Sequence, residues 1–202
     1  MSARADVVSG ALRGAALRDR ILSLPLHERD GFVDALLGLD APPPDDVPDL
    51  PRGAVPYLPC GVDEILTMVS EAPLGPADEL VDLGSGLGRV AVLAHLLTGA
   101  RARGIEIQAP LVASARTLCA ALALEGVSFE HANAAETELD GSVFFLYAPF
   151  NGALLAAVLR RLEEVARRRS IVVCAVDLGL DGVGWLEPRP RTHASLALYD
   201  AR

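Results

Sequence analysis

Lysine is absent from the sequence, and all 18 of its basic residues are arginine. Without lysine the chain cannot form the Schiff base that anchors pyridoxal phosphate. It also lacks the lysine with which a P-loop holds nucleotide phosphates. The absence of one residue type therefore excludes pyridoxal-phosphate enzymes and P-loop nucleotide hydrolases.

Cysteines and long apolar runs are scarce as well. Cys60, Cys119 and Cys174 lie far apart, and no CxxC pair or Cys/His cluster occurs, so we expect neither a disulfide framework nor a metal site. Such a pattern indicates a reducing, cytoplasmic setting. Charged residues interrupt the first 26 positions, and the densest apolar run, residues 143–150, is too short for a membrane helix. We therefore expect no signal peptide and no membrane span.

Acidic residues outnumber basic ones, which gives a formal net charge of −9. Proteins that bind nucleic acid usually present a basic face, so this balance disfavours a nucleic-acid partner. Hydrophobic residues make up 51% of the 202 residues, which is enough to build a large core. The length allows one domain of ordinary size with an appendage.

Three regions of the chain differ in composition. Residues 1–40 have apolar residues at helical spacing, with a break near Pro25, and we expect them to form an N-terminal helical extension. Residues 41–59 hold seven of the 14 prolines, and we expect an extended connector because proline fixes φ and removes a donor. Residues 60–202 are expected to form the main domain.

Within the main domain, apolar strands alternate with helices. The expected strands span residues 79–83, 102–107, 127–131, 143–148 and 170–176, and the helices between them span 90–97, 110–122 and 151–168. Residues 183–186 and 195–199 flank a turn and should form a closing hairpin. The pattern predicts an α/β fold with a doubly wound, mostly parallel seven-stranded sheet and right-handed crossovers.

A glycine-rich loop follows the first expected strand. Residues 81–90 read VDLGSGLGRV, so that Asp82 precedes Gly84, Gly86 and Gly88 in the pattern D-x-G-x-G-x-G. Glycines let the backbone turn sharply and let a ligand approach it, and the following helix offers free N–H groups. In an open parallel sheet such a loop lies where the strand order reverses, which is the usual place for a ligand.

The spacing of these glycines separates two classes of cofactor. The dinucleotide pattern G-x-G-x-x-G would need its third glycine at Arg89, and a carboxylate at Asp82 would repel a pyrophosphate. A carboxylate at that position suits the positively charged amino-acid end of S-adenosylmethionine. Glu106, 24 positions after Asp82, ends the second strand, where an acid can accept both ribose hydroxyls. Glu106 alone would also suit NAD.

These features resemble the class I S-adenosylmethionine-dependent methyltransferases, over roughly residue 55 to the C-terminus. The strongest resemblance lies in VDLGSGLGRV and in GIEIQ, residues 104–108. The upstream stretch VPYLPCGVDEIL, residues 55–66, is similar to that of the mitochondrial-type and prokaryotic lysine methyltransferases of the FAM173 group and, more distantly, of the Dot1 histone methyltransferases. The resemblance implies a Rossmann-like fold and S-adenosyl-L-methionine as cofactor. The cofactor-binding residues that it implies are Tyr57, Asp82, Gly84, Ser85, Gly86, Gly88, Glu106, Asn133 and Ala134.

The segment after the fourth strand bears on the methyl acceptor. Family members that methylate amino groups of bases often have Asn or Asp, then Pro, Pro and an aromatic residue at this place. Here Tyr147 and Ala148 occupy the first two positions, and only Pro149 and Phe150 match, which disfavours a nucleic-acid acceptor. Five of the nine aromatic residues lie between positions 129 and 150, where we expect rings to surround the reacting groups.

Two residues of this segment are candidates for catalysis. Tyr147 is expected to orient the acceptor. Asn151 opens a helix, so it either caps that helix or takes a direct part in catalysis. Phe144 and Phe145 are expected in the core, on opposite faces of the sheet.

The sequence thus predicts an S-adenosylmethionine-dependent methyltransferase whose acceptor is a protein lysine or a small molecule. One alternative is a module that binds S-adenosylmethionine without transferring its methyl group. A less favoured alternative is an NAD-dependent oxidoreductase. Each site residue also has an ordinary structural interpretation, since Asp82 could cap a turn, Glu106 could be a solvated strand end and Tyr57 could simply pack.

Overall fold

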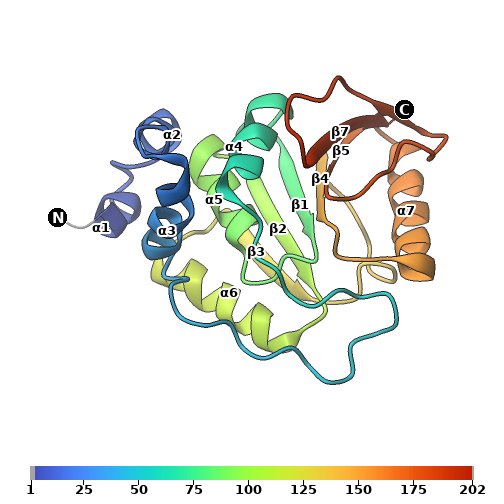
Figure 1. The fold of residues 1–202 in the computed structure, drawn as a ribbon, viewed down its shortest axis with the longest axis horizontal. Coiled ribbons are helices and arrows are strands. Elements are labelled where there is room, and N and C mark those ends of the chain that lie inside the picture. Colours follow the sequence, from blue (N-terminus) through green and yellow to red (C-terminus); the bar gives the residue numbers. More distant parts are fainter. Residues whose placement is uncertain (1–2, 202) are drawn as a thin grey trace.

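The computed structural model describes residues 3–201, in which seven strands form a single sheet (Figure 1). The strand order is β3-β2-β1-β4-β5-β7-β6. Neighbouring strands are parallel except that β7 runs antiparallel to both β5 and β6, which confirms the expected mostly parallel, doubly wound sheet. The strands are β1 (Glu79–Leu83), β2 (Arg101–Glu106), β3 (Val127–His131), β4 (Val143–Tyr147), β5 (Ile171–Val176), β6 (Leu186–Pro188) and β7 (Leu196–Ala201).

Helices cover both faces of the sheet (Figure 1). One face packs against α4 (Val62–Glu71), α5 (Arg89–Thr98) and α6 (Ala109–Ala121), and the other packs against α7 (Gly152–Ala166). Phe145 belongs to the first of these cores and Phe144 to the second, and both side chains are fully buried, as expected from the alternation of a strand. The sheet is therefore apolar on both sides, and polar groups concentrate at its strand ends.

The N-terminal region contains three helices rather than the two expected from the break at Pro25. These are α1 (Ala3–Val8), α2 (Gly14–Leu22) and α3 (Leu26–Leu37). The additional break follows α1, where Gly10 has a φ of +83° that a helix does not accommodate. Leu17 and Ile21 of α2 are fully buried in the same core as α4 and α5. The N-terminal helices thus extend the first layer of helices.

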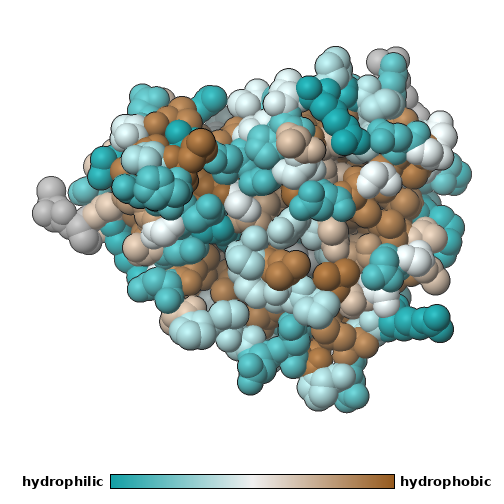
Figure 2. Space-filling view, viewed as in Figure 1, coloured by the Kyte–Doolittle hydropathy of each residue, from teal (hydrophilic) through white to brown (hydrophobic). Residues whose placement is uncertain are grey.

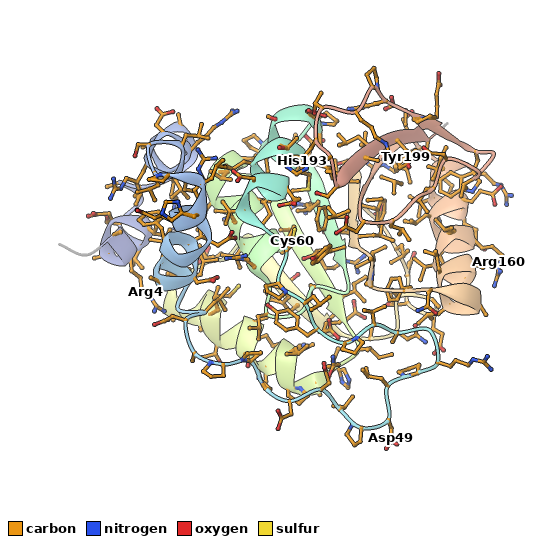
Figure 3. All side chains as sticks on the ribbon, viewed as in Figure 1. Arg4, Asp49, Cys60, Arg160, His193 and Tyr199 are labelled. Atoms are coloured by element: carbon orange, nitrogen blue, oxygen red, sulfur yellow. The ribbon has the colours of Figure 1, made fainter. Side chains whose placement is uncertain are left out.

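Residues 41–59, here called the strap, contain no helix or strand, as the prolines indicate. The strap leaves α3, crosses the carboxyl ends of the strands and returns to α4 along the lower edge of Figure 1. Asp49 marks its outermost bend, and Cys60 marks the point where it reaches α4 (Figure 3). An isolated bridge joins Ala54 to Phe150. The strap is thereby fastened to the edge at which the candidate site lies.

The closing hairpin differs from the expectation in its bounds. Val183 N donates to Leu180 O and Leu186 N donates to Val183 O, both at 2.9 Å, so residues 183–185 form turns and β6 begins only at Leu186. Its pairing with β7 confirms the hairpin itself. No helix within residues 3–201 is long and apolar enough to cross a membrane.

Candidate functional site

The register of the sheet places the candidate residues side by side at the carboxyl ends of neighbouring strands. Leu83 pairs with Ile105 on one side and with Leu146 on the other. The residues that follow these three are Gly84, Glu106 and Tyr147, and all three line a cavity of about 160 Å³ between the strand ends and the strap. The strap contributes Ala54, Val55, Pro56, Tyr57 and Leu58 to this lining.

The glycine loop has the backbone conformation that its sequence requires. Gly84, Gly86 and Gly88 have φ values of +83°, +53° and +86°. Gly84 N and Ser85 N both donate to the carbonyl oxygen of Ile105, at 2.8 and 3.2 Å, which ties the loop to β2. A Cβ atom at Gly86 would overlap the ring of Tyr57, so only glycine allows the strap to lie against the loop.

Glu106 is buried where β2 ends, with only 6% of its surface exposed. Its Oε2 accepts a hydrogen bond from Gly86 N at 2.9 Å, and its Oε1 accepts one from Gln108 N at 2.8 Å. Each oxygen keeps acceptor capacity beyond these two bonds. The carboxylate is thus held rigidly at the wall of the cavity and can still accept hydrogen bonds from a ligand.

Asp82 and Ser85 are buried beside a second cavity of about 20 Å³, which Tyr57, Cys60 and Tyr147 also line. Asp82 Oδ2 and Ser85 Oγ have no hydrogen-bond partner within residues 3–201. Burial, and secondly the charge of Glu106, raise the pKa of Asp82 to about 8. Buried polar atoms without partners are rare in folded proteins, so this acid is suited to pair with a cationic ligand.

Tyr57 reaches the site from the strap. Its ring lies on Gly86, and burial is the main cause that raises the pKa of its hydroxyl to about 12. Arg89, the first residue of α5, donates to the carbonyl oxygen of Cys60 and pairs with Asp30 Oδ1 at 2.9 Å and Asp34 Oδ1 at 2.8 Å. This buried arginine joins the glycine loop to the end of the strap and to α3.

Tyr147 and Asp177 line the same cavity where β4 and β5 end, and Asp177 is exposed. Asp177 has a φ of +49° and neighbouring Ala148 one of +37°, an uncommon conformation outside glycine. The pKa of Tyr147 is raised by partial burial and then by the charges of Cys60, Asp177 and Glu64. The surroundings of Tyr147 are therefore acidic.

Asn133 and Ala134 line the cavity beside the end of β3. The side chain of Asn133 is engaged locally, since Oδ1 accepts from Ala135 N at 3.0 Å and Nδ2 donates to Glu136 Oε1 at 2.8 Å. Ala134 is buried. The side-chain oxygen of Asn133 is thus shared with the turn that it begins.

Asn151 is outside the set of residues that line the 160 Å³ cavity. It occupies the position before α7, but its side chain makes no capping hydrogen bond there, so the capping interpretation is wrong. Instead its backbone N–H donates to Gly53 O of the strap at 2.8 Å. A part for Asn151 in catalysis stays a prediction.

Of the five aromatic residues between positions 129 and 150, three border the cavities and two do not. Phe144 lies in the core beneath α7, and Phe129 packs against Gly88 and Gly104. Phe145, Tyr147 and Phe150 do border the cavities. Alternation along β4 accounts for Phe144, which was expected in the core, because successive side chains of a strand point to opposite faces.

Sequence reasoning missed Asp46 and Gln108. Gln108 is only 2% exposed, its Oε1 accepts from Val47 N at 2.9 Å and its Nε2 donates to Asp46 Oδ1 at 2.7 Å. Asp46 Oδ1 also accepts from Tyr57 N at 3.1 Å. Asp46 and Gln108 are 62 positions apart, so no local pattern signals their contact.

Neither a family model nor a curated protein matches the sequence. Solved structures share the fold. An RNA methyltransferase from Salinibacter ruber in complex with S-adenosyl-L-homocysteine is 24% identical, with a TM-score of 0.57 over 71% of this chain and 92% of that chain. A putative methyltransferase, yhhF, from Escherichia coli is 19% identical, with a TM-score of 0.58 over 79% of this chain and 91% of that one.

A third similar structure is magnesium protoporphyrin IX methyltransferase (ChlM) from Synechocystis PCC 6803 with bound SAM. It is 14% identical, with a TM-score of 0.52 over 69% of this chain and 76% of that one. The chain therefore has the Rossmann-like fold of the class I S-adenosylmethionine-dependent methyltransferases, as expected. At these identities the likeness concerns the fold alone, and the lysine methyltransferase subgroup stays a prediction.

Proposed function

We propose that the chain is an S-adenosylmethionine-dependent methyltransferase that binds its cofactor across the carboxyl ends of β1, β2 and β4. The observation that carries this proposal is the pair of buried carboxylates around the glycine loop. Asp82 has an unpartnered oxygen toward one cavity, and Glu106 is fixed at the wall of the other. A ligand with a cationic end and a ribose matches both groups.

The residues present fit this cofactor. Asp82 would hold its ammonium group, and this pairing would shift the acid toward its ionised form. Glu106 would accept hydrogen bonds from the ribose hydroxyls. Ile107, Ala134 and Leu154 supply apolar walls suited to an adenine. When bound, S-adenosylmethionine supplies a methyl group activated on a sulfonium.

The remaining work of the chain is alignment and exclusion of water. Tyr57 closes over the glycine loop from the strap, and its ring face favours a nearby cation. Tyr147 stands half-buried in the wall of the cavity, beside the exposed Asp177, where it can orient an acceptor. Positioning and desolvation account for much of the acceleration in displacements of this kind, so no shared catalytic triad is required.

Two alternative functions are disfavoured. Arg89 occupies the third position of the dinucleotide pattern, and its buried side chain is engaged by Asp30 and Asp34, which argues against an NAD-dependent oxidoreductase. A module that binds the cofactor without transferring methyl would use the same loop. The exposed carboxylate of Asp177 beside Tyr147 favours an enzyme, because a pure binding module needs no charged group at this place.

Calorimetric titration with S-adenosylmethionine, S-adenosylhomocysteine and NAD tests the proposal. We expect the first two to bind and NAD not to bind. Glu106→Ala should weaken S-adenosylhomocysteine binding at least about tenfold, since each hydrogen bond to a charged group contributes about 1.5–3 kcal/mol. Glu106→Gln keeps one acceptor oxygen and should lose less. Binding of NAD alone, or parental affinity in Glu106→Ala, would overturn the proposal.

For the acceptor we propose a lysine side chain of a protein, with a small amine as the second candidate. The resemblance of residues 55–66 supports lysine, and so does the charge around Tyr147. The carboxylate of Asp177 has no hydrogen bond or ion pair within residues 3–201, while the charge of Arg89 is balanced by α3. An exposed acid beside the reacting group would attract an ammonium. The net charge of −9 argues against a nucleic-acid acceptor.

Asp177→Asn should lower kcat/KM for lysine peptides about tenfold, the equivalent of about 1.4 kcal/mol. Affinity for S-adenosylhomocysteine should fall much less, because Asp177 is not among the residues proposed to hold the cofactor. Methyl transfer to arrayed lysine peptides, measured with radiolabelled S-adenosylmethionine, gives this number. Asp19→Asn on α2 removes the same charge from an exposed position and is the control. An unchanged kcat/KM in Asp177→Asn would contradict the assignment.

A further inference from the structure

The cavity beneath the strap is small for a cofactor of the proposed class. Small-molecule sites usually measure about 300–1,000 Å³, whereas the cavity beneath the strap measures about 160 Å³. The cavity is thus smaller than such sites usually are, and the strap supplies five of the residues that line it. Figure 2 shows apolar surface in several separate patches among hydrophilic residues on the face that the strap crosses. Leu58 of the strap is 61% exposed.

The strap is fastened at two places with different chemistry. Next to α7 it pairs through the backbone, with Val55 N donating to Pro149 O at 3.0 Å and Asn151 N donating to Gly53 O at 2.8 Å. Next to α6 it depends on side chains, namely the amide of Gln108 and the carboxylate of Asp46. The second attachment is the one that substitution can change without altering the backbone.

The contacts around Gln108 form a closed network that begins and ends at Gly86. Glu106 accepts from Gly86 N and Gln108 N, Gln108 holds Asp46, and Asp46 holds the backbone of Tyr57. The ring of Tyr57 returns to Gly86 and completes the circuit. The group that would bind the ribose and the residue that covers the loop are thus linked by Gln108.

We infer that Gln108 is a positioning residue that latches the strap, and with it Tyr57, over the bound cofactor. This inference rests on the proposed function. An amide is required because one oxygen must accept from Val47 N while one N–H donates to Asp46. The latch contributes to ligand affinity by keeping Tyr57 in place, and Gln108 itself needs no contact with the reacting atoms.

Gln108→Glu tests the latch with a change of one atom. The new carboxylate would face Asp46 Oδ1, now 2.7 Å from Nε2, and would repel the strap. We expect affinity for S-adenosylhomocysteine to fall about tenfold, within the 5–150-fold range common for coupled sites. A simple electrostatic effect predicts the opposite, because added negative charge near the site would favour the cationic ammonium.

Exchange of the two groups provides a partial rescue. In Gln108→Glu with Asp46→Asn, the new amide can donate to the new carboxylate, so the repulsion disappears and affinity should rise severalfold above that of Gln108→Glu. Recovery should stay incomplete, because Asp46 Oδ1 also accepts from Tyr57 N and an NH2 group in its place cannot. Asp46→Ala removes the carboxylate that Gln108 and Tyr57 contact, and Asp46 is exposed. This variant tests the latch if Gln108→Glu fails to fold. Asp45→Ala removes the same charge from the neighbouring exposed position and should leave affinity unchanged.

Limited trypsin digestion measures how readily the strap detaches in the ligand-free protein. Arg52 is exposed within the strap, so cleavage after it should accelerate severalfold in Gln108→Glu and Asp46→Ala but not in Asp45→Ala. Parental cleavage and parental affinity in both latch variants would overturn the inference. If the parent bound no S-adenosylhomocysteine, the proposed function would fail, while the cleavage rates would still report on the latch.

Discussion

Gly86→Val should abolish measurable binding of S-adenosylhomocysteine, a loss of at least about 100-fold, while the protein stays folded. The new Cβ would overlap the ring of Tyr57, and a branched side chain would occupy the space between the loop and the strap. The φ of +53° at this position adds strain of about 1–3 kcal/mol for a branched residue. Because the loop lies outside the two apolar cores, this strain should not unfold the chain.

Calorimetry of binding together with thermal unfolding of the ligand-free protein separates the two effects. Gly182→Val is the matched control, because a Cβ there meets nothing within 4 Å and φ is not positive. Gly86→Ala should lie between the parent and Gly86→Val, since it lacks the branched methyl groups. If Gly86→Val bound the ligand as tightly as the parent, the cofactor would not lie on this loop.

Arg89→Met should lower stability by about 1.5–3 kcal/mol, the range for a hydrogen bond to a charged group, because the side chains of Asp30 and Asp34 are themselves 54% and 31% exposed. The side chain of Arg89 is only 6% exposed, and it balances Asp30 and Asp34 of α3. Without it these carboxylates stay in place with no cation. Cys60, which directly follows the strap, would also lose the hydrogen bond that Arg89 donates to its carbonyl oxygen, so ligand affinity should fall as well.

Urea unfolding at several pH values checks this expectation. Burial is the main cause that raises the pKa of Asp34, and Arg89 opposes it. In Arg89→Met this opposition disappears, so the pKa of Asp34 in the folded protein rises further above its value in the unfolded chain. Between these two pKa values the free energy of unfolding decreases as pH increases, because the unfolded chain ionises Asp34 more readily. The difference in free energy of unfolding between Arg89→Met and the parent should therefore become smaller toward pH 4.

The control for Arg89→Met is Arg101→Met. Arg101 is 69% exposed and pairs with Glu79 at 3.2 Å on the surface. Surface pairs contribute about 0–1 kcal/mol, so this variant should unfold near the parental midpoint. Equal effects of the two substitutions would show that the contacts of Arg89 with α3 do not stabilise the fold.

The order of strands and helices was readable in the sequence because each strand is a short apolar run bounded by glycine or polar residues. Residues 79–83, 127–131 and 143–147 became strands within one residue of the expected bounds. The glycine loop could be predicted for a related reason. Three glycines at alternate positions allow positive φ values that other residues adopt only with strain. Local rules therefore determined the sheet, its helices and the position of the candidate site.

Only the tertiary structure decided what covers that site. Gln108 and Asp46 lie 62 positions apart, and Arg89 meets Asp30 across 59 positions, so their pairing depends on how the helices and the strap pack. A proline-rich segment carries no sign of the surface against which it will lie. The sequence by itself determined a glycine loop between two acids. The fold then decided which polar groups became buried together, because burial removes water and leaves each donor to the nearest acceptor.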